Sequence, residues 1–254
     1  MDINRNKINR SFFYGDLLFE TIRVANGQAM HIALHFERLQ RGLQLMAING
    51  LALDADRFTQ LITEEIAANN LIDARIRFTV LRGGEGGYRF SHAEPQIHIH
   101  SEALTKAQLH VCNMLGLFAE IKRPIHPLST IKTGQALTQI MAGLAAQKYG
   151  WDDCVILNEN QTVACTIQAN IFILKNNRLK TTNALQGAIC GIMQQVVTNL
   201  ANMPVDHGVV TLNDLQEAEE IFLTNAIRKV VPVLSFNDKT YATDFARLLY
   251  GLIP

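Results

Sequence analysis

The chain has 254 residues, of which 48% are hydrophobic and 18% are charged, so it can bury one large core or two smaller ones without disulfides. Lysine plus arginine and aspartate plus glutamate both number 23. This balance argues against the broad electrostatic attraction that nucleic acid or an anionic membrane requires. A small neutral or zwitterionic ligand is therefore expected.

The cysteines and the N-terminus indicate the compartment. The cysteines occur singly, without C-x-x-C spacing, at positions 112, 154, 165 and 190. This pattern is typical of reduced thiols and predicts no zinc cluster. Residues 1–10 are polar and lack the apolar segment of a signal peptide, and no apolar run is long enough to span a membrane. The sequence therefore predicts a cytoplasmic protein with no membrane partner.

The first part of the chain alternates between patterns typical of strands and of helices. Apolar residues spaced by three and four predict helices at 31–48 and from Asp54 to Asn70. Strand patterns occur at 17–24, 75–80, 96–100 and 109–117, and a glycine-rich loop at 83–87 is expected to be a hairpin tip. These elements predict a small N-terminal α/β domain over residues 1–110, followed by a linker at 111–122.

The rest of the chain predicts a larger domain over residues 123–254. It begins with a proline-punctuated segment, and a helix is expected at 137–145. A meander of short strands follows, at 153–157, 162–166, 170–174 and 178–182. A helix at 189–200, strands at 205–210 and 220–224, and a last helix at 243–250 complete the chain. The expected fold class is α/β (α+β) with two domains.

Lys132 is the candidate reactive residue. It lies in LSTIKTG at 128–134, between the proline-punctuated segment and an apolar helix. A lysine amine attacks carbonyl carbons only when desolvation or a neighbouring cation lowers its pKa. A lysine at such a boundary, backed by apolar residues, suits Schiff-base chemistry.

The stretch GAICGIM at 187–193 predicts an anion site. Its glycines allow backbone N–H groups to point at a ligand, and the helix that follows adds a favourable dipole for a phosphate group. An ordinary helix start with turning glycines is the alternative interpretation.

Two other patterns suggest different chemistry. Ser129-x-x-Lys132 and Lys132-Thr133-Gly134 match two motifs of penicillin-recognising serine acyl-enzymes. Those enzymes use two separate lysines, and their S-D-N motif is missing here. His98 and His100 share one face of a strand, but no third ligand is predicted nearby, so no metal site is expected.

Six segments, in this order, resemble the class IV aminotransferase family of pyridoxal-phosphate (PLP) enzymes, which have fold type IV. They are GDLLFETIRV at 15–24, HFERL at 35–39, IKTG at 131–134, ANIF at 169–172, GIM at 191–193, and NA at 225–226 with VPV at 231–233. The family holds branched-chain and D-amino-acid aminotransferases and aminodeoxychorismate lyases. The resemblance implies two domains with PLP bound between them, and a homodimer.

The resemblance also implies roles for individual residues. Lys132 would carry the cofactor and move the proton on the α-carbon of an amino acid-type substrate. Arg38 would grip the cofactor phosphate, a role suited to a guanidinium. The remaining phosphate contacts would come from the helix start at Gly191, Ile192 and Met193, and from a turn at Asn225 and Ala226. For the substrate carboxylate, the sequence offers Arg23, Arg77 and Arg228.

Three details resemble the lyases more than the aminotransferases. Asn225-Ala226 stands where aminotransferases usually carry Gly-Thr, and CGIMQ at 190–194 follows the lyase pattern. Leu137 stands where branched-chain aminotransferases have a tyrosine. The resemblance thus implies a lyase that releases pyruvate and leaves 4-aminobenzoate for folate synthesis. An aminotransferase is the close alternative.

Cys165 departs from the family pattern. It stands five positions before Asn170, where the family carries a glutamate that pairs with the pyridine nitrogen of PLP. A neutral thiol cannot hold a protonated pyridine as a carboxylate does. We expect this to favour elimination over transamination, and it also leaves open a non-catalytic relative that binds a phosphate-bearing ligand.

Overall fold

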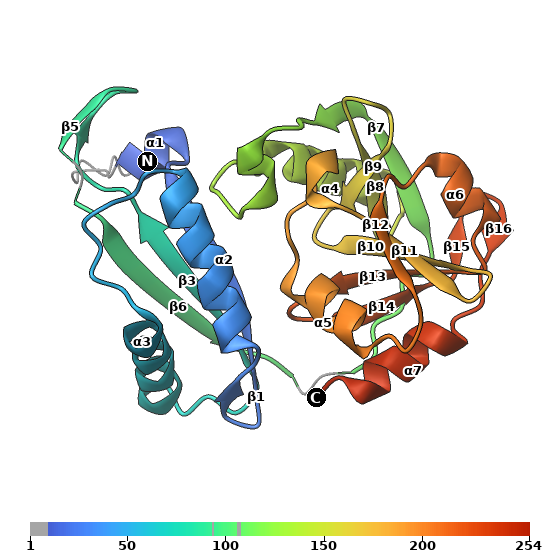
Figure 1. Ribbon diagram of the computed structural model, residues 1–254, viewed down its shortest axis with the longest axis horizontal. Helices are drawn as coiled ribbons and strands as arrows, with labels where there is room; N and C mark the ends of the chain where they lie inside the picture. Colours follow the sequence, from blue (N-terminus) through green and yellow to red (C-terminus); the bar gives the residue numbers. More distant parts are fainter. Residues whose placement is uncertain (1–9, 93, 106–107) are drawn as a thin grey trace. The chain divides into compact units, whose positions relative to one another are not determined.

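The computed structural model describes residues 10–92, 94–105 and 108–254 (Figure 1). The chain forms two compact units. Unit 1 comprises the residues up to Ala103 together with Lys132–Gln135, and unit 2 comprises Leu104–Ile131 and Ala136–Pro254. Residues 1–9, whose polar composition predicts no targeting segment, lie outside the described residues.

Unit 1 is built on an antiparallel four-stranded sheet in the order β2-β1-β3-β6. The strands are β1 (Leu17–Ala25), β2 (Gln28–Ala29), β3 (Ala74–Leu81) and β6 (Gln96–Ala103). Helices α2 (Ile32–Leu45) and α3 (Ala55–Ala68) belong to the same unit. Alternate β3 residues are buried, and Phe78 meets Phe58 of α3 with ring centroids 4.8 Å apart. The helices therefore cover one face of the sheet, and the other, here called the polar face, carries Thr21 and Arg77 together with Phe19.

A short segment from later in the chain pairs with the edge of β1. The Phe19 N–H donates to the Lys132 carbonyl at 3.0 Å, and the Gly134 N–H donates to the Leu17 carbonyl at 3.2 Å. A Cβ on Gly134 would lie 2.8 Å from the Gly15 carbonyl oxygen, so only glycine fits this approach. This pairing places Lys132 in unit 1.

The glycine-rich loop of unit 1 belongs to a hairpin, but residues 85–86 form its first strand and its tip lies later than expected, between Gly86 and Phe90. Its strands are β4 (Glu85–Gly86) and β5 (Phe90–His92). Nearby, helix α1 (Arg10–Tyr14) is attached through Arg10, whose Nη2 donates to the Gly87 carbonyl at 2.8 Å. Asp16 lies 3.1 Å from Arg10 and accepts from Arg82 at 2.8 Å.

Unit 2 contains two five-stranded sheets, ordered β12-β11-β10-β13-β14 and β16-β15-β7-β8-β9. The first consists of β10 (Asn170–Lys175), β11 (Arg178–Thr182), β12 (Val205–Gly208), β13 (Glu220–Asn225) and β14 (Lys229–Val233). The second consists of β7 (Leu115–Arg123), β8 (Asp153–Asn158), β9 (Val163–Thr166), β15 (Ser235–Phe236) and β16 (Lys239–Thr240). One apolar core joins them, with Val155 and Leu157 packed among Ile171, Ile173 and Leu223.

Helices flank these sheets, with α5 (Ile192–Leu200) and α7 (Asp244–Leu252) near β13 and β14 (Figure 1). Helix α4 (Leu137–Tyr149) packs Ala142 and Ala146 against Phe118 and Ile156. Short 3₁₀ turns, η1 (Pro127–Thr130) and η2 (Ala184–Gln186), complete the unit. Among the described residues, no helix is both long and apolar enough to cross a bilayer.

Residues 111–122, expected to be a linker, instead contain most of β7. This strand pairs in parallel with β8, and its Leu115 and Phe118 are buried in unit 2. Burying these apolar side chains stabilises the segment as a strand. The chain leaves unit 1 earlier than expected, after Ala103.

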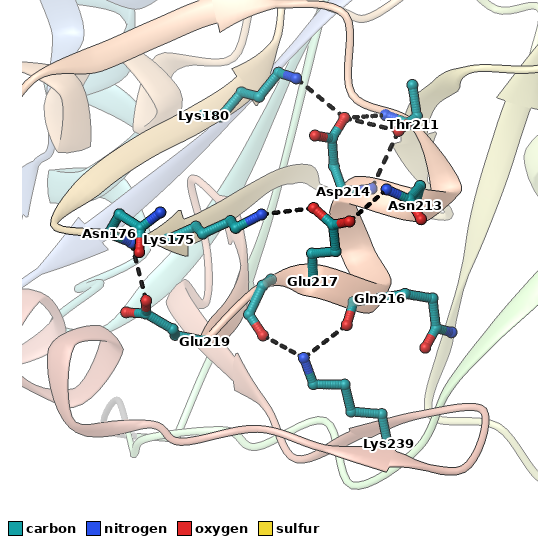
Figure 2. Close-up of polar contacts among 11 residues, drawn as sticks. Lys175, Asn176, Lys180, Thr211, Asn213, Asp214, Gln216, Glu217, Glu219 and Lys239 are labelled. Carbon is teal, nitrogen blue, oxygen red and sulfur yellow. Dashed lines mark hydrogen bonds and ion pairs between the residues drawn. The ribbon is translucent and has the colours of Figure 1, made fainter.

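Helix α6 (Leu212–Glu217) was not predicted by apolar periodicity and is held by polar contacts (Figure 2). At its start, Thr211 Oγ1 accepts from the Asp214 N–H at 3.1 Å, and Asp214 accepts from the Thr211 N–H at 2.7 Å. At its end, Lys239 Nζ donates to the carbonyls of Gln216 and Ala218. This capping box and the lysine together satisfy both ends of a helix that is otherwise too short to be stable.

We expect Thr211→Ala to lower the free energy of unfolding by about 1 kcal/mol, because it removes a capping hydroxyl. The melting temperature should fall by about 2–4 °C. Thermal unfolding followed by circular dichroism measures this. Thr59→Ala, at an exposed position of α3, is the matched control, since its hydroxyl donates to the Ala55 carbonyl of the preceding turn. Equal losses in the two variants would contradict the role given to the cap.

Candidate functional site

Lys132 is held against the polar face of the unit 1 sheet. Its Nζ donates to Thr21 Oγ1 at 3.1 Å and lies 4.6 Å from the centre of the Phe19 ring. Burial lowers the pKa of Lys132 to about 7, and the positive charges of Arg38 and Arg77 add to this effect. Much of the amine is therefore neutral near pH 7, as a lysine nucleophile requires.

Arg38 lies on helix α2 and is bound to a buried carboxylate. Its Nε donates to Glu20 Oε1 at 2.8 Å and its Nη2 donates to Glu20 Oε2 at 2.5 Å. His35, one turn earlier on α2, contacts the same carboxylate through Nδ1 at 2.6 Å. Burial alone would raise the pKa of Glu20, but Arg38 and His35 outweigh it and lower that pKa to about 2. The pair fixes the position of the guanidinium.

Arg77 shares the polar sheet face with Thr21, its partner in the β1–β3 register. Its guanidinium stacks 3.7 Å from the centre of the Phe19 ring, the same ring that Lys132 approaches. Arg23 instead forms an ion pair with Asp73 at 3.4 Å and is buried, which indicates a structural role. Arg228 lies in unit 2 and is exposed. Of these arginines, Arg77 is the one whose charge acts on Lys132.

In unit 2, Gly191 is the N-cap of α5, and Ile192 and Met193 are its first residues. The first turn of a helix has backbone N–H groups without intrahelical partners, and the helix dipole adds positive potential there. No side chain caps this end. An anion would satisfy both features. Gly187 lies apart from this turn, because it ends η2 and packs on the Pro124 carbonyl.

Asn225 is the last residue of β13, and Ala226 begins the turn that follows it. Asn225 Oδ1 accepts from the N–H groups of Ile227 and Arg228, at 3.0 Å and 2.8 Å. The residue before them, Thr224, is 1% exposed, and its hydroxyl has no hydrogen-bond partner among the described residues. An unpaired buried hydroxyl beside such a turn fits an anion such as a phosphate group.

Cys165 lies in β9, where it is buried among apolar side chains that include Phe118 and Ile156. Burial raises the pKa of its thiol, so the side chain is neutral near pH 7. The turn that follows is fixed by Asp153, which accepts from the Ile167 N–H at 3.0 Å. The position therefore offers no negative charge.

Ser129 is not arranged as a nucleophile. Its hydroxyl donates to the Pro124 carbonyl at 2.7 Å, and its contact with His126 Nδ1 is long, at 3.5 Å. Lys132, the base that an acyl-enzyme would require, donates to Thr21 instead. In the described part of the chain, no cluster of three histidine, cysteine or acidic side chains could hold a metal ion.

The predicted site residues thus fall into two groups. Lys132 and Arg38 belong to unit 1, whereas unit 2 contains the others: Cys165, Gly191, Ile192, Met193, Asn225 and Ala226. Sequence reasoning missed Thr21, Glu20 and His35. One signal was available for Glu20, since strand alternation puts it on the apolar face of β1, where a carboxylate needs a partner.

Comparison with known proteins decides the family. The model of the amino-transferase class IV family matches residues 17–236. The chain belongs to this family. It is 28% identical over 245 residues to the aminodeoxychorismate lyase of Vibrio harveyi, covering 93% of this chain and 89% of that one. A Methanocaldococcus jannaschii protein provisionally named a branched-chain-amino-acid aminotransferase is also 28% identical, over 253 residues, covering 94% and 84%.

The fold and the cofactor follow from the same comparison. A branched-chain amino acid aminotransferase from T.th., solved with pyridoxamine 5′-phosphate, superposes with a TM-score of 0.86 at 18% identity, covering 98% of this chain and 88% of that one. The class IV fold that the resemblance implied is confirmed, and PLP dependence follows from membership of the class IV family. The residues fit the cofactor, because Lys132 offers a partly neutral amine and the start of α5 offers donors for a phosphate.

Proposed function

We propose that this class IV enzyme is a lyase that eliminates pyruvate from 4-amino-4-deoxychorismate, leaving 4-aminobenzoate for folate synthesis. The observation that carries the proposal is the hydrogen bond between Lys132 Nζ and the Thr21 hydroxyl. Elimination requires a proton to leave one carbon and another to reach the departing fragment. An amine and a hydroxyl in contact provide two groups for these transfers.

Bound PLP supplies an aldehyde for the substrate amine and a ring that accepts electrons from the α-carbon. Lys132, with its pKa near 7, takes the proton from that carbon. Thr21 holds the amine in place and exchanges a proton with it. In unit 1 the guanidinium of Arg38, and in unit 2 the helix start at Gly191, each offer donors that suit a phosphate group.

Cys165 supports elimination in this proposal. When PLP is bound, Cys165 would offer its ring nitrogen no carboxylate, so the ring would be a weaker electron acceptor. Elimination depends less on that acceptor than transamination does, because the leaving group carries the electrons away. The buried, neutral state of the thiol agrees with this role.

Arg77 is the proposed partner of a substrate carboxylate, because it lies on the sheet face of Thr21 and Lys132. We expect Arg77→Met to raise KM about 10–100-fold, because it removes a charge-assisted hydrogen bond to the substrate carboxylate. The absorbance of bound PLP should stay unchanged. Arg75→Met is the control, since Arg75 forms an exposed pair with Glu102. An unchanged KM in Arg77→Met would remove this residue from substrate recognition.

Product analysis tests the proposed reaction. The PLP-loaded protein should convert 4-amino-4-deoxychorismate into equal amounts of pyruvate and 4-aminobenzoate, without a keto acid acceptor. Chromatography and a lactate dehydrogenase assay measure the two products. Amino transfer to a keto acid with no pyruvate release would refute the lyase proposal.

An aminotransferase is the second candidate, favoured by the similarity to the Methanocaldococcus jannaschii protein. Mixing the PLP-loaded protein with single L- and D-amino acids separates the two. An aminotransferase converts its cofactor to the amine form in this half-reaction, with a large change in absorbance. A colourless protein that takes up no PLP would instead indicate a non-catalytic relative.

We also infer a homodimer. Helix α4 exposes a row of apolar side chains spaced by three and four, with Leu137 77% exposed and Ile140 and Leu144 each 54% exposed. Exposed apolar rows of this kind are usually covered by a partner. Size-exclusion chromatography with light scattering should give twice the 28.4 kDa mass of the chain. A monomer at micromolar concentration would contradict this inference.

A further inference from the structure

Asn170 and Thr224 face each other across two neighbouring strands of unit 2. They are direct partners in the antiparallel register of β10 and β13, so their side chains lie on the same face of the sheet. Phe172 and Phe222, the next pair on that face, stack with ring centroids 5.1 Å apart. Both polar residues are buried, at 8% and 1% exposure.

Asn170 contacts the turn that leads into α5. Its Nδ2 donates to the Ile189 carbonyl at 2.9 Å. Its Oδ1 lies 1.9 Å from the place that a Cβ on Gly191 would occupy. The amide therefore packs directly on the N-cap of the helix and leaves room only for glycine. The side chain of Asn170 sets where the first N–H groups of α5 point.

Thr224 brings an unsatisfied donor to the same place. Its hydroxyl is buried and has no partner among the described residues. Burying a hydroxyl without a partner costs free energy, so such a group indicates a missing partner. Asn170, the partner of Thr224 across the two strands, touches the start of α5. Asn225, the next residue in the chain, accepts from the backbone of the turn that follows β13.

The ligand that suits this place is an anion. The groups that converge are a hydroxyl, the first turn of a helix and an amide that fixes that turn. Glu220, the acid on the same sheet face, lies at the far end of β13 and accepts from the N–H groups of Phe245 and Ala246 in α7. The carboxylate of Glu220 therefore does not oppose the positive potential that the helix dipole creates at the start of α5.

We propose that Thr224 and Asn170 complete the phosphate site of the cofactor. Thr224 donates its hydroxyl to a phosphate oxygen, and Asn170 is a positioning residue that orients the N–H groups at Gly191 and Ile192. This rests on the proposed role of the α5 start as the phosphate site. It adds two residues to that site: Thr224, which lies outside the six family segments, and Asn170, which lies in the segment ANIF but had no role assigned to it.

The test compares two ligands that differ only in the phosphate. Full-length apoprotein is titrated with PLP and with pyridoxal, and each dissociation constant is measured. Thr224→Val should raise the dissociation constant of PLP about tenfold or more, because it removes a hydrogen bond to a charged group. The dissociation constant of pyridoxal should stay unchanged. Thr224→Ser, which keeps the hydroxyl, should restore the affinity for PLP. Asn170→Ala should weaken PLP with little effect on pyridoxal.

The melting temperature of the apoprotein separates binding from structure. Replacing an unpaired buried hydroxyl with a methyl group should leave that temperature unchanged or raise it. A Thr224→Val variant that binds PLP as tightly as the wild type would overturn the inference, as would equal losses for PLP and pyridoxal. If the wild type binds PLP and pyridoxal with equal affinity, the start of α5 is not a phosphate site, and the inference is wrong as well.

Discussion

Lys132→Ala should lower kcat by about a thousandfold or more, because it removes both the amine that takes up the aldehyde of PLP and the group that moves the substrate proton. The absorbance of protein-bound PLP should shift to that of the free aldehyde. Steady-state kinetics and an absorbance spectrum measure these effects. Lys148→Ala is the matched control, since Lys148 lies at the exposed end of α4. Equal activity in Lys132→Ala and the wild type would remove Lys132 from the reaction.

The lowered pKa of Lys132 gives this prediction a pH dependence. The amine is protonated below pH 7 and neutral above it, because burial and neighbouring cations lower its pKa to about 7. The rate at which the apoprotein takes up PLP should therefore rise through the range around pH 7 and level off above it. Stopped-flow absorbance measures the rate of PLP uptake between pH 5.5 and 9, limits that lie about 1.5–2 units on either side of the pKa of Lys132. A rate that is still rising at pH 9 would show that the pKa of the amine stays close to the ordinary lysine value.

Glu20→Gln should lower the free energy of unfolding by about 3–5 kcal/mol. It leaves the guanidinium of Arg38 buried without its carboxylate. The pKa of Glu20 is about 2 in the folded protein, against an ordinary 4.5. The stability that Glu20 contributes is therefore complete above about pH 4.5 and is lost as the pH falls toward 2. Urea unfolding at pH 7 and at pH 3 measures both effects.

Two controls make this prediction specific. Glu102→Gln breaks an exposed pair with Arg75, and it should cost less than about 1 kcal/mol. The double variant Glu20→Leu with Arg38→Met should recover much of the lost stability, because apolar residues can replace a buried ion pair. A loss in Glu20→Gln no larger than that in Glu102→Gln would show that the buried pair does not stabilise the unit.

Much of the fold followed from local patterns. The strand patterns at 153–157 and 170–174 became β8 and β10, and the apolar stripe of 31–48 became α2. The alternation of residues along a strand does not indicate which other strand it pairs with, however. The expected meander is divided between two sheets, with β8 and β9 in one and β10 and β11 in the other. Helix α6 was missed because its stability comes from caps and lysines distant in sequence.

Some residues of the candidate site could likewise be predicted from the sequence, and others could not. Lys132, Arg38 and Gly191 stand in recognisable motifs, so sequence alone could nominate them. The contact of Thr21 with Lys132 joins residues 111 positions apart, and no local pattern indicates it. Thr224 was equally hidden, because its hydroxyl is notable only when its burial is known. The partners of Arg38 depend on the packing of α2 against β1.

Reductive labelling tests the central claim most directly, that Lys132 is the amine carrying PLP. The PLP-loaded protein is treated with borohydride and digested, and the peptides are sequenced by mass spectrometry. We expect a phosphopyridoxyl group on the peptide that contains Lys132, and its loss in Lys132→Ala. A label on another lysine, or no label on a protein that has taken up PLP, would contradict it.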